Sequence, residues 1–380
     1  MIEDYYAKLG VTKIINAAGT FTALSASIMP PSVQAAVAEA AKYPVRLVEL
    51  QRAAGEYLAK RLKCEAAYVT SGAASALTLG TAACMTLSDP TAANRIPFDM
   101  SGIRNEVIVQ RAHRYEYDRA LTNAGIGFVE VETMREYEDA FGEKTVMTHF
   151  FNGAEGGDIG RKEWVRVAHE HGVPCFNDAA ADVPPISNLW NYTAMGFDLV
   201  TFSGGKGIRG PQNAGLLLGR KDLIHAVAGM SAPISAAFGR PMKVAKEQIA
   251  GMVAAVDWFL TQSDEAMETE FRKRAETIAG QLKDVPTLRS RIVVPNVAAN
   301  RVPHLMLNYE RGQVKIAAAE VMKQLRDGNP SIELHPATGT TDYPGLRSEL
   351  DTIVVGVWML QPGEELVVAK RLRQTLMRYV

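Results

Sequence analysis

A lysine set among glycines at the end of an apolar segment is the residue of this sequence best suited to covalent chemistry. Residues 199–202 read as a buried strand, and the glycine-rich loop 203–211, which contains Lys206, follows directly. Burial at a strand end disfavours the ammonium and lowers the pKa of the amine. A neutral amine can form a Schiff base with a carbonyl compound. An exposed lysine in an ordinary glycine-rich turn is the alternative that this segment alone leaves open.

The same loop carries the letters of a dinucleotide-binding motif. Gly205 to Gly210 match G-x-G-x-x-G, but that fingerprint needs a helix after its third glycine. Pro211 and a strand-like segment at 215–218 follow here instead. A Walker A loop needs Ser or Thr after its lysine, whereas Gly207 stands there. Neither motif explains the loop.

Length, charge and cysteine content restrict the class of protein. The chain has 380 residues, 47% hydrophobic and 22% charged, which is enough for two or three folding units. The formal net charge of −1 provides no basic surface for nucleic acid or anionic lipid and favours small-molecule partners. The three scattered cysteines, Cys64, Cys84 and Cys175, suit a reducing cytoplasm. We expect no signal peptide, and the uncharged residues 66–88 are too polar for a membrane span.

Alternating strand-like and helix-like segments fill the first two thirds of the chain. The expected strands are 66–70, 106–110, 126–131, 145–151, 173–176, 199–202 and 215–218, and the expected helices are 47–62, 73–87, 115–124 and 162–171. Such alternation predicts an α/β fold with a mostly parallel sheet that is covered on both faces. The loops that begin at Ser71, Gln110, Asn152, Asn177 and Ser203 should then meet at one edge of the sheet.

The pattern changes after Pro241, where long helical segments come first. Helices are expected at 242–260, 265–282 and 314–326 and from Pro362 onward, and strands at 302–309, 331–335 and 352–359. This is typical of a smaller α+β domain. We therefore expect an N-terminal segment at 1–45 that contacts the active site, a large domain at 46–241, and a linking helix with a small C-terminal domain at 242–380.

Three loops at the expected sheet edge carry polar groups. The segment Thr70–Ala73 lies between a strand and a helix, where backbone N–H groups and the Ser71 hydroxyl could hold a phosphate; a plain N-cap is the alternative. Asp178 is the only charge in Asn177–Ala181 and needs a partner such as a protonated ring nitrogen, unless it caps a turn. His113 follows another strand end, where it could stack on an aromatic ring or be structural.

An anion cradle, a ring-stacking histidine, a buried carboxylate and a desolvated lysine are together what pyridoxal 5′-phosphate (PLP) requires. The chain resembles fold-type I PLP enzymes, specifically the group that contains selenocysteine synthase and D-glucosaminate-6-phosphate ammonia-lyase. The resemblance rests on Ile15–Thr20, Ser71–Ala74, Val109–Arg114, Asn177–Ala181 and Phe202–Gln212. It covers residues 13–225 closely and the C-terminal domain loosely, and it implies a large domain with a seven-stranded sheet.

The resemblance also implies a role for each matching residue. Lys206 forms the aldimine with PLP, Asp178 pairs with the pyridinium nitrogen, and His113 stacks on the ring; these three are the expected catalytic residues. The expected phosphate ligands are Ser71, Gly72, Ala73 and Ser203. No metal ligand is expected.

The partner of the cofactor's 3′-oxygen stays open. Asn152 matches a position that approaches this oxygen in related enzymes. A tyrosine or histidine often stands three residues past the aspartate in such enzymes, but Ala181 occupies that position here.

The expected reaction is a lyase reaction on a hydroxylated amino acid, with or without a phosphate group, in which ammonia and water leave and a 2-oxo acid forms. Racemisation or epimerisation and aldol cleavage are alternatives, since the residue types exclude neither, and a non-catalytic metabolite-binding protein is a third. Candidate ligands for a second anionic group are Arg209, Arg240 and Arg347. The near-neutral charge and a start close to Asn16 argue against a tRNA-bound substrate. The resemblance implies a homodimer or a higher homo-oligomer.

Overall fold

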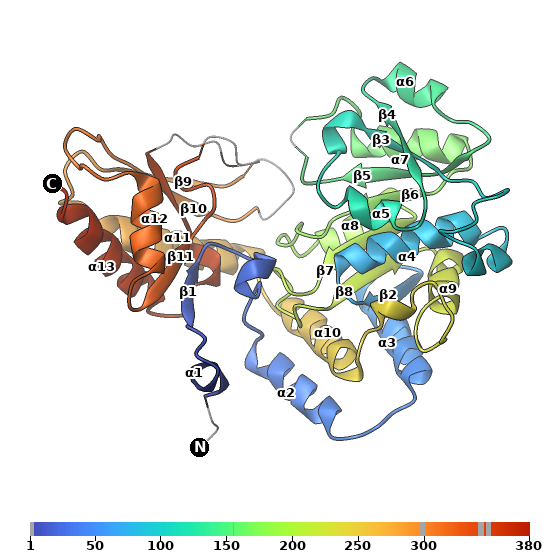
Figure 1. Ribbon diagram of the computed structural model, residues 1–380, viewed down its shortest axis with the longest axis horizontal. Helices are drawn as coiled ribbons and strands as arrows, with labels where there is room; N and C mark the ends of the chain where they lie inside the picture. Colours follow the sequence, from blue (N-terminus) through green and yellow to red (C-terminus); the bar gives the residue numbers. More distant parts are fainter. Residues whose placement is uncertain (1–3, 155, 296–300, 341–345, 347–350) are drawn as a thin grey trace. The chain divides into compact units, whose positions relative to one another are not determined.

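The computed structural model describes residues 4–154, 156–295, 301–340, 346 and 351–380. The chain forms two compact units. The larger unit is built on Ser27–Gln262, and the smaller one combines Met1–Ala26, Ser263–Asn296 and Arg301–Val380. The larger unit has one sheet, the smaller unit has two, and each unit has its own helices (Figure 1).

A seven-stranded sheet with the order β2-β8-β7-β6-β5-β3-β4 organises the larger unit. Its strands are β2 (Ala66–Thr70), β3 (Glu106–Gln110), β4 (Gly127–Val131), β5 (Thr145–Phe151), β6 (Cys175–Asp178), β7 (Leu199–Ser203) and β8 (Gly215–Gly219). Only β8 runs antiparallel to its neighbours, β2 and β7. The mostly parallel sheet expected from the alternating pattern is therefore confirmed.

Helices cover both faces of this sheet (Figure 1). The helices of the larger unit are α2 (Pro31–Ala41), which packs on α10, α3 (Leu47–Leu62), α4 (Ala73–Thr86), α5 (Asp118–Thr122), α6 (Met134–Asp139), α7 (Arg161–Glu170), α8 (Asn188–Met195), α9 (Lys221–Gly229) and α10 (Lys246–Phe259). Helix α4 is buried along nearly its whole length and packs on the face that Phe176 presents. Helix α7 packs on the opposite face, where its Trp164 meets Phe150, because successive strand residues point to opposite faces.

The smaller unit contains two short sheets. Strands β9 (Arg289–Val293), β10 (His304–Asn308) and β12 (Thr352–Gly356) form an antiparallel sheet, and β1 (Ile14–Ala17) pairs in parallel with β11 (Ser331–Leu334). Its helices are α1 (Tyr5–Lys8), α11 (Asp264–Gly280), α12 (Ala318–Arg326) and α13 (Glu364–Met377). An apolar core joins α11, α12 and α13 to these strands, so this part is an α+β unit, as expected.

The structure divides the chain at points that differ from the expected boundaries. Residues up to Ala26 group with the smaller unit, because β1 pairs with β11. Helix α10 groups with the larger unit, because it packs against α2 and α3.

Several element boundaries also differ from those read off the sequence. Strand β6 begins at Cys175 and includes Asp178, whereas Val173 closes the preceding helix by donating its N–H to Ala168 O. Helix α5 begins only at Asp118, and α10 begins at Lys246 after the 3₁₀ turn Arg240–Met242. Asp178 is thus held by the sheet itself rather than by a loop.

Candidate active site

The loops that follow β2, β3, β5, β6 and β7 meet at one edge of the large sheet, because these five strands run in the same direction. This edge contains the residues expected to hold the cofactor, and each is positioned by the end of a strand or by the loop that follows it: Ser71, Gly72, Ala73, His113, Asn152, Asp178, Ser203 and Lys206.

Asp178 and Lys206 form the charged centre of this edge. Asp178 is 3% exposed and accepts hydrogen bonds from the Ala180 N–H at 2.9 Å and from the Tyr115 hydroxyl. Desolvation raises the pKa of Asp178, and the two hydrogen bonds and Lys206 oppose this rise. Desolvation also lowers the pKa of Lys206, against the pull of the Asp178 and Asp182 carboxylates. The lysine is therefore a better nucleophile than an exposed one.

Backbone contacts hold the lysine loop in place. The Gly204 N–H donates to Ala214 O at 2.8 Å, and the Gly210 N–H donates to Gly204 O at 2.7 Å. A Cβ on Gly207 would lie 2.2 Å from Val183 O, so only glycine fits there. The Ser27 hydroxyl donates to Gly205 O at 2.7 Å. The glycines thus allow tight packing behind Lys206 rather than a flexible turn.

The N-terminus of α4 offers donors for an anion. Gly72 precedes the helix with φ 89°, its Cβ direction is open, and the first turn contains no acidic residue. The first N–H groups of a helix have no partner within it and attract negative charge. The Ser71 hydroxyl already donates to Met242 O at 2.9 Å, so the backbone N–H groups of Ala73 and its successor are the donors available.

His113 and Tyr115 follow β3 and have different surroundings. His113 is 3% exposed, accepts the Phe151 N–H on Nδ1 at 3.3 Å and meets the edge of the Phe150 ring at 4.4 Å. Burial lowers the pKa of His113 to about 4, which leaves the ring neutral at pH 7. Tyr115 stacks on Phe151 at 4.0 Å and stays protonated, because burial and the Asp178 charge raise its pKa.

A second buried carboxyl, Asp182, lies near the first. It is 2% exposed and accepts the Tyr192 hydroxyl at 2.9 Å. Desolvation raises the pKa of Asp182 to about 8, and the neighbouring Asp178 adds to this rise. Asn152, 4% exposed, accepts the Arg161 Nε–H at 2.6 Å. A carboxyl that keeps its proton near neutral pH beside a lysine is typical of a functional site.

The residues present fit a phosphorylated pyridinium ring. The α4 N-terminus suits a phosphate, Asp178 is a buried counter-charge for a ring nitrogen, and the Lys206 amine suits an aldehyde. Asn152 is buried at the same edge, and a hydrogen bond from its side chain lowers the pKa of Asp182. Bound PLP would give the N–H groups at the start of α4 an acceptor and the Asp178 carboxylate a cationic partner.

Sequence reasoning missed four residues of this site. Tyr115, Asp182, Arg161 and Tyr192 received no role, and Gln110 was named only as a loop start. Gln110 binds Ile159 with both side-chain ends, at 2.9 and 3.0 Å, and so anchors the loop after β5. Tyr115 and Asp182 stand two and four residues from His113 and Asp178, and that proximity was the available signal.

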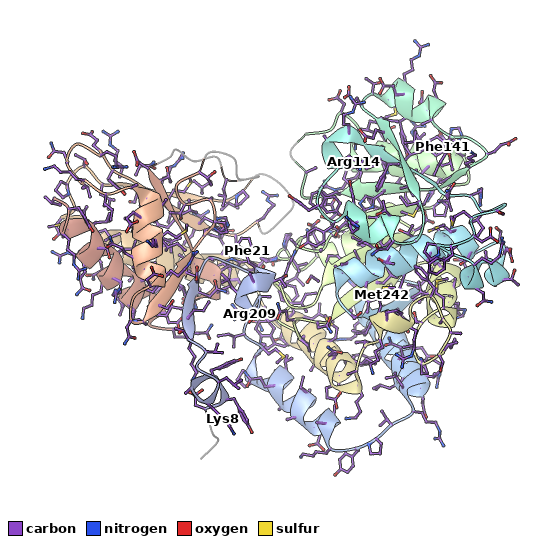
Figure 2. All side chains as sticks on the ribbon, viewed as in Figure 1. Lys8, Phe21, Arg114, Phe141, Arg209 and Met242 are labelled. Carbon is purple, nitrogen blue, oxygen red and sulfur yellow. The ribbon has the colours of Figure 1, made fainter. Side chains whose placement is uncertain are left out.

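The other expected ligands are spread more widely. Ser203 ends β7, and its N–H donates to Ala180 O at 3.1 Å. Arg209, at φ 56°, places its guanidinium 5.9 Å from the Trp258 ring (Figure 2), and Arg240 lies in a 3₁₀ turn. The motif Ile15–Thr20 lies in the smaller unit. Arg347 lies outside the described residues.

One group of potential metal ligands lies away from the sheet edge. Atoms of His169, Cys175 and Asp198 fall within 4.8 Å of one another. Asp198 already accepts the Cys175 N–H at 2.8 Å and pairs with His169 at 2.9 Å and with Arg220 at 3.2 Å. The Arg220 guanidinium would repel a metal ion at this place. We therefore interpret His169, Cys175 and Asp198 as part of an ion-pair network.

The topology and the site define the class, which is a fold-type I α/β enzyme. A family model described as "SelA: L-seryl-tRNA selenium transferase" matches residues 14–272. The chain belongs to this family.

Two characterised relatives match nearly the whole chain. A 5′-C-glycyluridine monooxygenase-decarboxylase from a Streptomyces species is 28% identical over 98% of this chain and 92% of its own length. The D-glucosaminate-6-phosphate ammonia lyase of Salmonella typhimurium is 28% identical over 87% of this chain and 89% of its own length.

Solved structures agree with this placement. A D-glucosaminate-6-phosphate ammonia-lyase structure superposes with a TM-score of 0.83 at 27% identity and covers 100% of both chains. A serine palmitoyltransferase from S. paucimobilis, solved with PLP bound, shares only the fold, with a TM-score of 0.56 at 14% identity over 97% of this chain and 88% of that one. The expected group and fold are therefore confirmed. No described helix has the length and apolar character needed to cross a membrane.

Proposed function

We propose that this chain is a cytoplasmic PLP-dependent lyase that removes ammonia from a hydroxylated, anionic amino acid. The β-hydroxyl leaves as water, water then releases the nitrogen as ammonia, and the net products are a 2-oxo acid and ammonia. The observation that carries this proposal is the buried pair of Lys206 and Asp178 at the edge of the large sheet. The whole chain superposes on a D-glucosaminate-6-phosphate ammonia-lyase.

PLP, when bound, supplies an aldehyde and an electron-withdrawing ring that stabilises a carbanion next to the substrate nitrogen. Lys206 would hold the aldehyde through its amine, and the same amine, when free, would take the α-proton of the substrate. Its lowered pKa favours both roles, because more of the amine is neutral at a given pH. Asp178 would stabilise a positive charge on the ring nitrogen. Tyr115 and Ala180 fix the two carboxylate oxygens of Asp178 through hydrogen bonds.

The remaining roles follow from position. The backbone N–H groups at the start of α4 would hold the phosphate together with the Ser203 side chain, and the Ser71 hydroxyl would join them only by releasing Met242 O. His113, neutral and buried, would stack on the ring without adding charge.

The first experiment tests the cofactor. Purified protein should show a visible absorption band with PLP, and borohydride should fix the cofactor to Lys206, detected by peptide mass. The Lys206→Ala variant should lose both signals, whereas Lys221→Ala, an exposed lysine at the start of α9, should keep them. A band that survives Lys206→Ala with no trappable cofactor would refute the PLP site.

The second experiment tests the reaction. D-Glucosaminate 6-phosphate and other β-hydroxy amino acids are incubated with the holoenzyme, and 2-oxo acid and ammonia are measured together with optical rotation, aldehyde and oxygen uptake. Equal amounts of 2-oxo acid and ammonia support the lyase. Enantiomer exchange alone indicates a racemase, aldehyde release indicates an aldolase, and oxygen uptake indicates chemistry like that named for the Streptomyces relative.

We further propose that the enzyme is a homodimer or a higher homo-oligomer, as the family resemblance implies. Light scattering coupled to gel filtration measures the mass directly. A monomer that is fully active at nanomolar concentration would contradict this assembly.

A further inference from the structure

Asp182 is a second buried carboxyl beside the lysine loop. It follows the end of β6, where its backbone N–H donates to Ala179 O at 3.1 Å and closes a turn. The next residue, Val183, has its carbonyl oxygen 2.2 Å from the place where a Cβ on Gly207 would lie. The chain directly after Asp182 therefore packs against the chain directly after Lys206.

Two neighbouring side chains hold the Asp182 carboxyl in place. The Tyr192 hydroxyl, from α8, donates to Asp182 Oδ2 at 2.9 Å. A second hydrogen bond comes from the side chain of Asn152. Asn152 follows β5, and its backbone N–H donates to Asp178 O at 3.3 Å. Asp182 thus lies at the ends of the adjacent strands β5, β6 and β7, where the lysine loop begins.

Burial sets the charge state of this carboxyl. Desolvation raises the pKa of Asp182 to about 8, and the charge of Asp178 adds to this rise. The hydrogen bonds from Tyr192 and Asn152 oppose the rise, and so does the positive charge of Arg161 at the start of α7. The rise exceeds these opposing contributions, so the carboxyl holds a proton at pH 7.

The other titratable groups at this edge suit different tasks. The pKa of His113 falls to about 4 and the pKa of Tyr115 lies well above its ordinary value, so neither group is a good acid at pH 7. The pKa of Lys206 is lowered, although the charge of Asp182 acts against this. Neighbouring groups whose pKa values are moved in opposite directions are typical of an acid and base pair. Lys206 suits the base, and Asp182 suits the acid.

Loss of a β-hydroxyl needs an acid, because a proton on the departing oxygen lowers the barrier. We propose that Asp182 is the general acid of the reaction and gives its proton to the β-hydroxyl while the bond between that oxygen and the β-carbon breaks. The electron pair of the broken bond leaves with water, and the pair left on the α-carbon forms the double bond to the β-carbon.

The protons balance within the pair of residues. Lys206 becomes an ammonium when it takes the α-proton, and Asp182 becomes a carboxylate when it gives its proton away. The two opposite charges stabilise each other in the buried site. Transfer of the proton from Lys206 to Asp182 restores both groups. The inference rests on the proposed function and adds a further catalytic residue to it.

Three variants separate an acid from a merely structural residue. Asp182→Asn keeps the size of the side chain and removes the acidic proton. Tyr192→Phe removes a hydrogen bond that lowers the pKa of Asp182, so it should raise this pKa further. Asp139→Asn is the control, because Asp139 is an exposed carboxylate at the end of α6.

The first measurement detects the proton without any reaction. Infrared difference spectra of the PLP-loaded proteins at pH 7 should show the band of one protonated carboxyl in the wild type that Asp182→Asn lacks. The band should disappear as the pH rises through about 8. Its midpoint should lie at higher pH in Tyr192→Phe and should be unchanged in Asp139→Asn. Equal bands in the wild type and Asp182→Asn would overturn the proposal.

The second measurement compares two leaving groups. D-Glucosaminate 6-phosphate loses a β-hydroxyl, whereas its analogue with chlorine in place of this hydroxyl loses chloride, which needs no proton. Asp182→Asn should slow release of the 2-oxo acid from the hydroxyl compound by about 10²- to 10⁴-fold and leave the rate with the chloro compound close to that of the wild type. Asp139→Asn should match the wild type with both compounds.

Equal losses with both compounds in Asp182→Asn would show a structural role and overturn the proposal. Unchanged rates with both would overturn it too, because Lys206 would then be the acid. If Asp182→Asn does not fold, Tyr192→Phe decides: the alkaline limit of the hydroxyl reaction should move to higher pH, and an unmoved limit would overturn the proposal. A wild type that releases no 2-oxo acid from either compound would instead refute the proposed function.

Discussion

Neutralising Asp178 should strengthen the empty fold while it weakens the holoenzyme. In Asp178→Asn, Oδ1 still accepts the Ala180 N–H, and the new NH₂ group can donate to the Tyr115 hydroxyl, which can rotate to accept. Both contacts therefore survive, and only the charge is lost.

The size of the stability change is set by two opposing contributions, the cost of burying the Asp178 charge and the hydrogen bonds that this charge strengthens. Burial of one ion costs several kcal/mol, whereas the two hydrogen bonds to Asp178 each lose about 1 kcal/mol when their acceptor becomes neutral. Burial outweighs the opposing contributions, including Lys206, because the pKa of Asp178 is raised overall. We expect the apo Asn variant to unfold with about 1–3 kcal/mol more free energy than the apo wild type at pH 7.5.

The difference in unfolding free energy between Asp178→Asn and the wild type should depend on pH. An acid whose pKa is raised in the folded state gains stability as the pH falls toward that pKa. The advantage of Asp178→Asn should therefore shrink as the pH falls from 7.5 toward the raised pKa of Asp178. Added PLP should stabilise the wild type more than the variant, because only the wild type has a counter-charge for the ring nitrogen.

Urea unfolding of both proteins, with and without PLP, measures all four free energies. The control is Asp158→Asn, since Asp158 is exposed. An apo Asp178→Asn protein that is less stable than the apo wild type, or an advantage that grows on acidification, would refute this reasoning.

Two further predictions concern residues that support the site. Burial lowers the pKa of His113 from 6.5 to about 4, so the stability it provides is complete above about pH 6.5 and is lost as the pH falls toward 4. His113→Gln should reduce the loss of unfolding free energy between pH 7 and pH 4.5 by about 2 kcal/mol. The control His225→Gln changes an exposed histidine, and equal pH slopes of His113→Gln and the wild type in calorimetry would contradict the prediction. Gly207→Ala should destabilise the protein by about 1–3 kcal/mol, since the added Cβ would lie 2.2 Å from Val183 O. Gly229→Ala, with open space around the added Cβ, is the matched control. Equal melting temperatures for the two variants would contradict the prediction, because the loop at Gly207 would then have shifted to accept the methyl group.

Much of the fold and the centre of the site could be predicted because they depend on local sequence. Apolar strands alternating with helices indicate a parallel sheet, and parallel strands bring their carboxyl ends to one edge whatever the details of packing. Lys206, Asp178 and the loop at Ser71 follow such strands directly. Their meeting at one edge therefore followed from their positions along the chain.

The partners of these residues depended on tertiary structure. Tyr115 reaches Asp178 from 63 positions away, and Arg161 reaches Asn152 from another element. Such contacts are set by side-chain direction and packing, which no local pattern records. The extent of β6 and the grouping of β1 with the smaller unit were likewise decided by pairing between distant segments.

The sequence by itself determined the chemistry that is available: one amine among glycines, one isolated carboxylate, and a glycine at the start of a helix. Only the tertiary structure decided the state of these groups, because the desolvation that lowers the pKa of Lys206 and raises those of Asp178 and Asp182 exists only once the strands, helices and loops have closed around them.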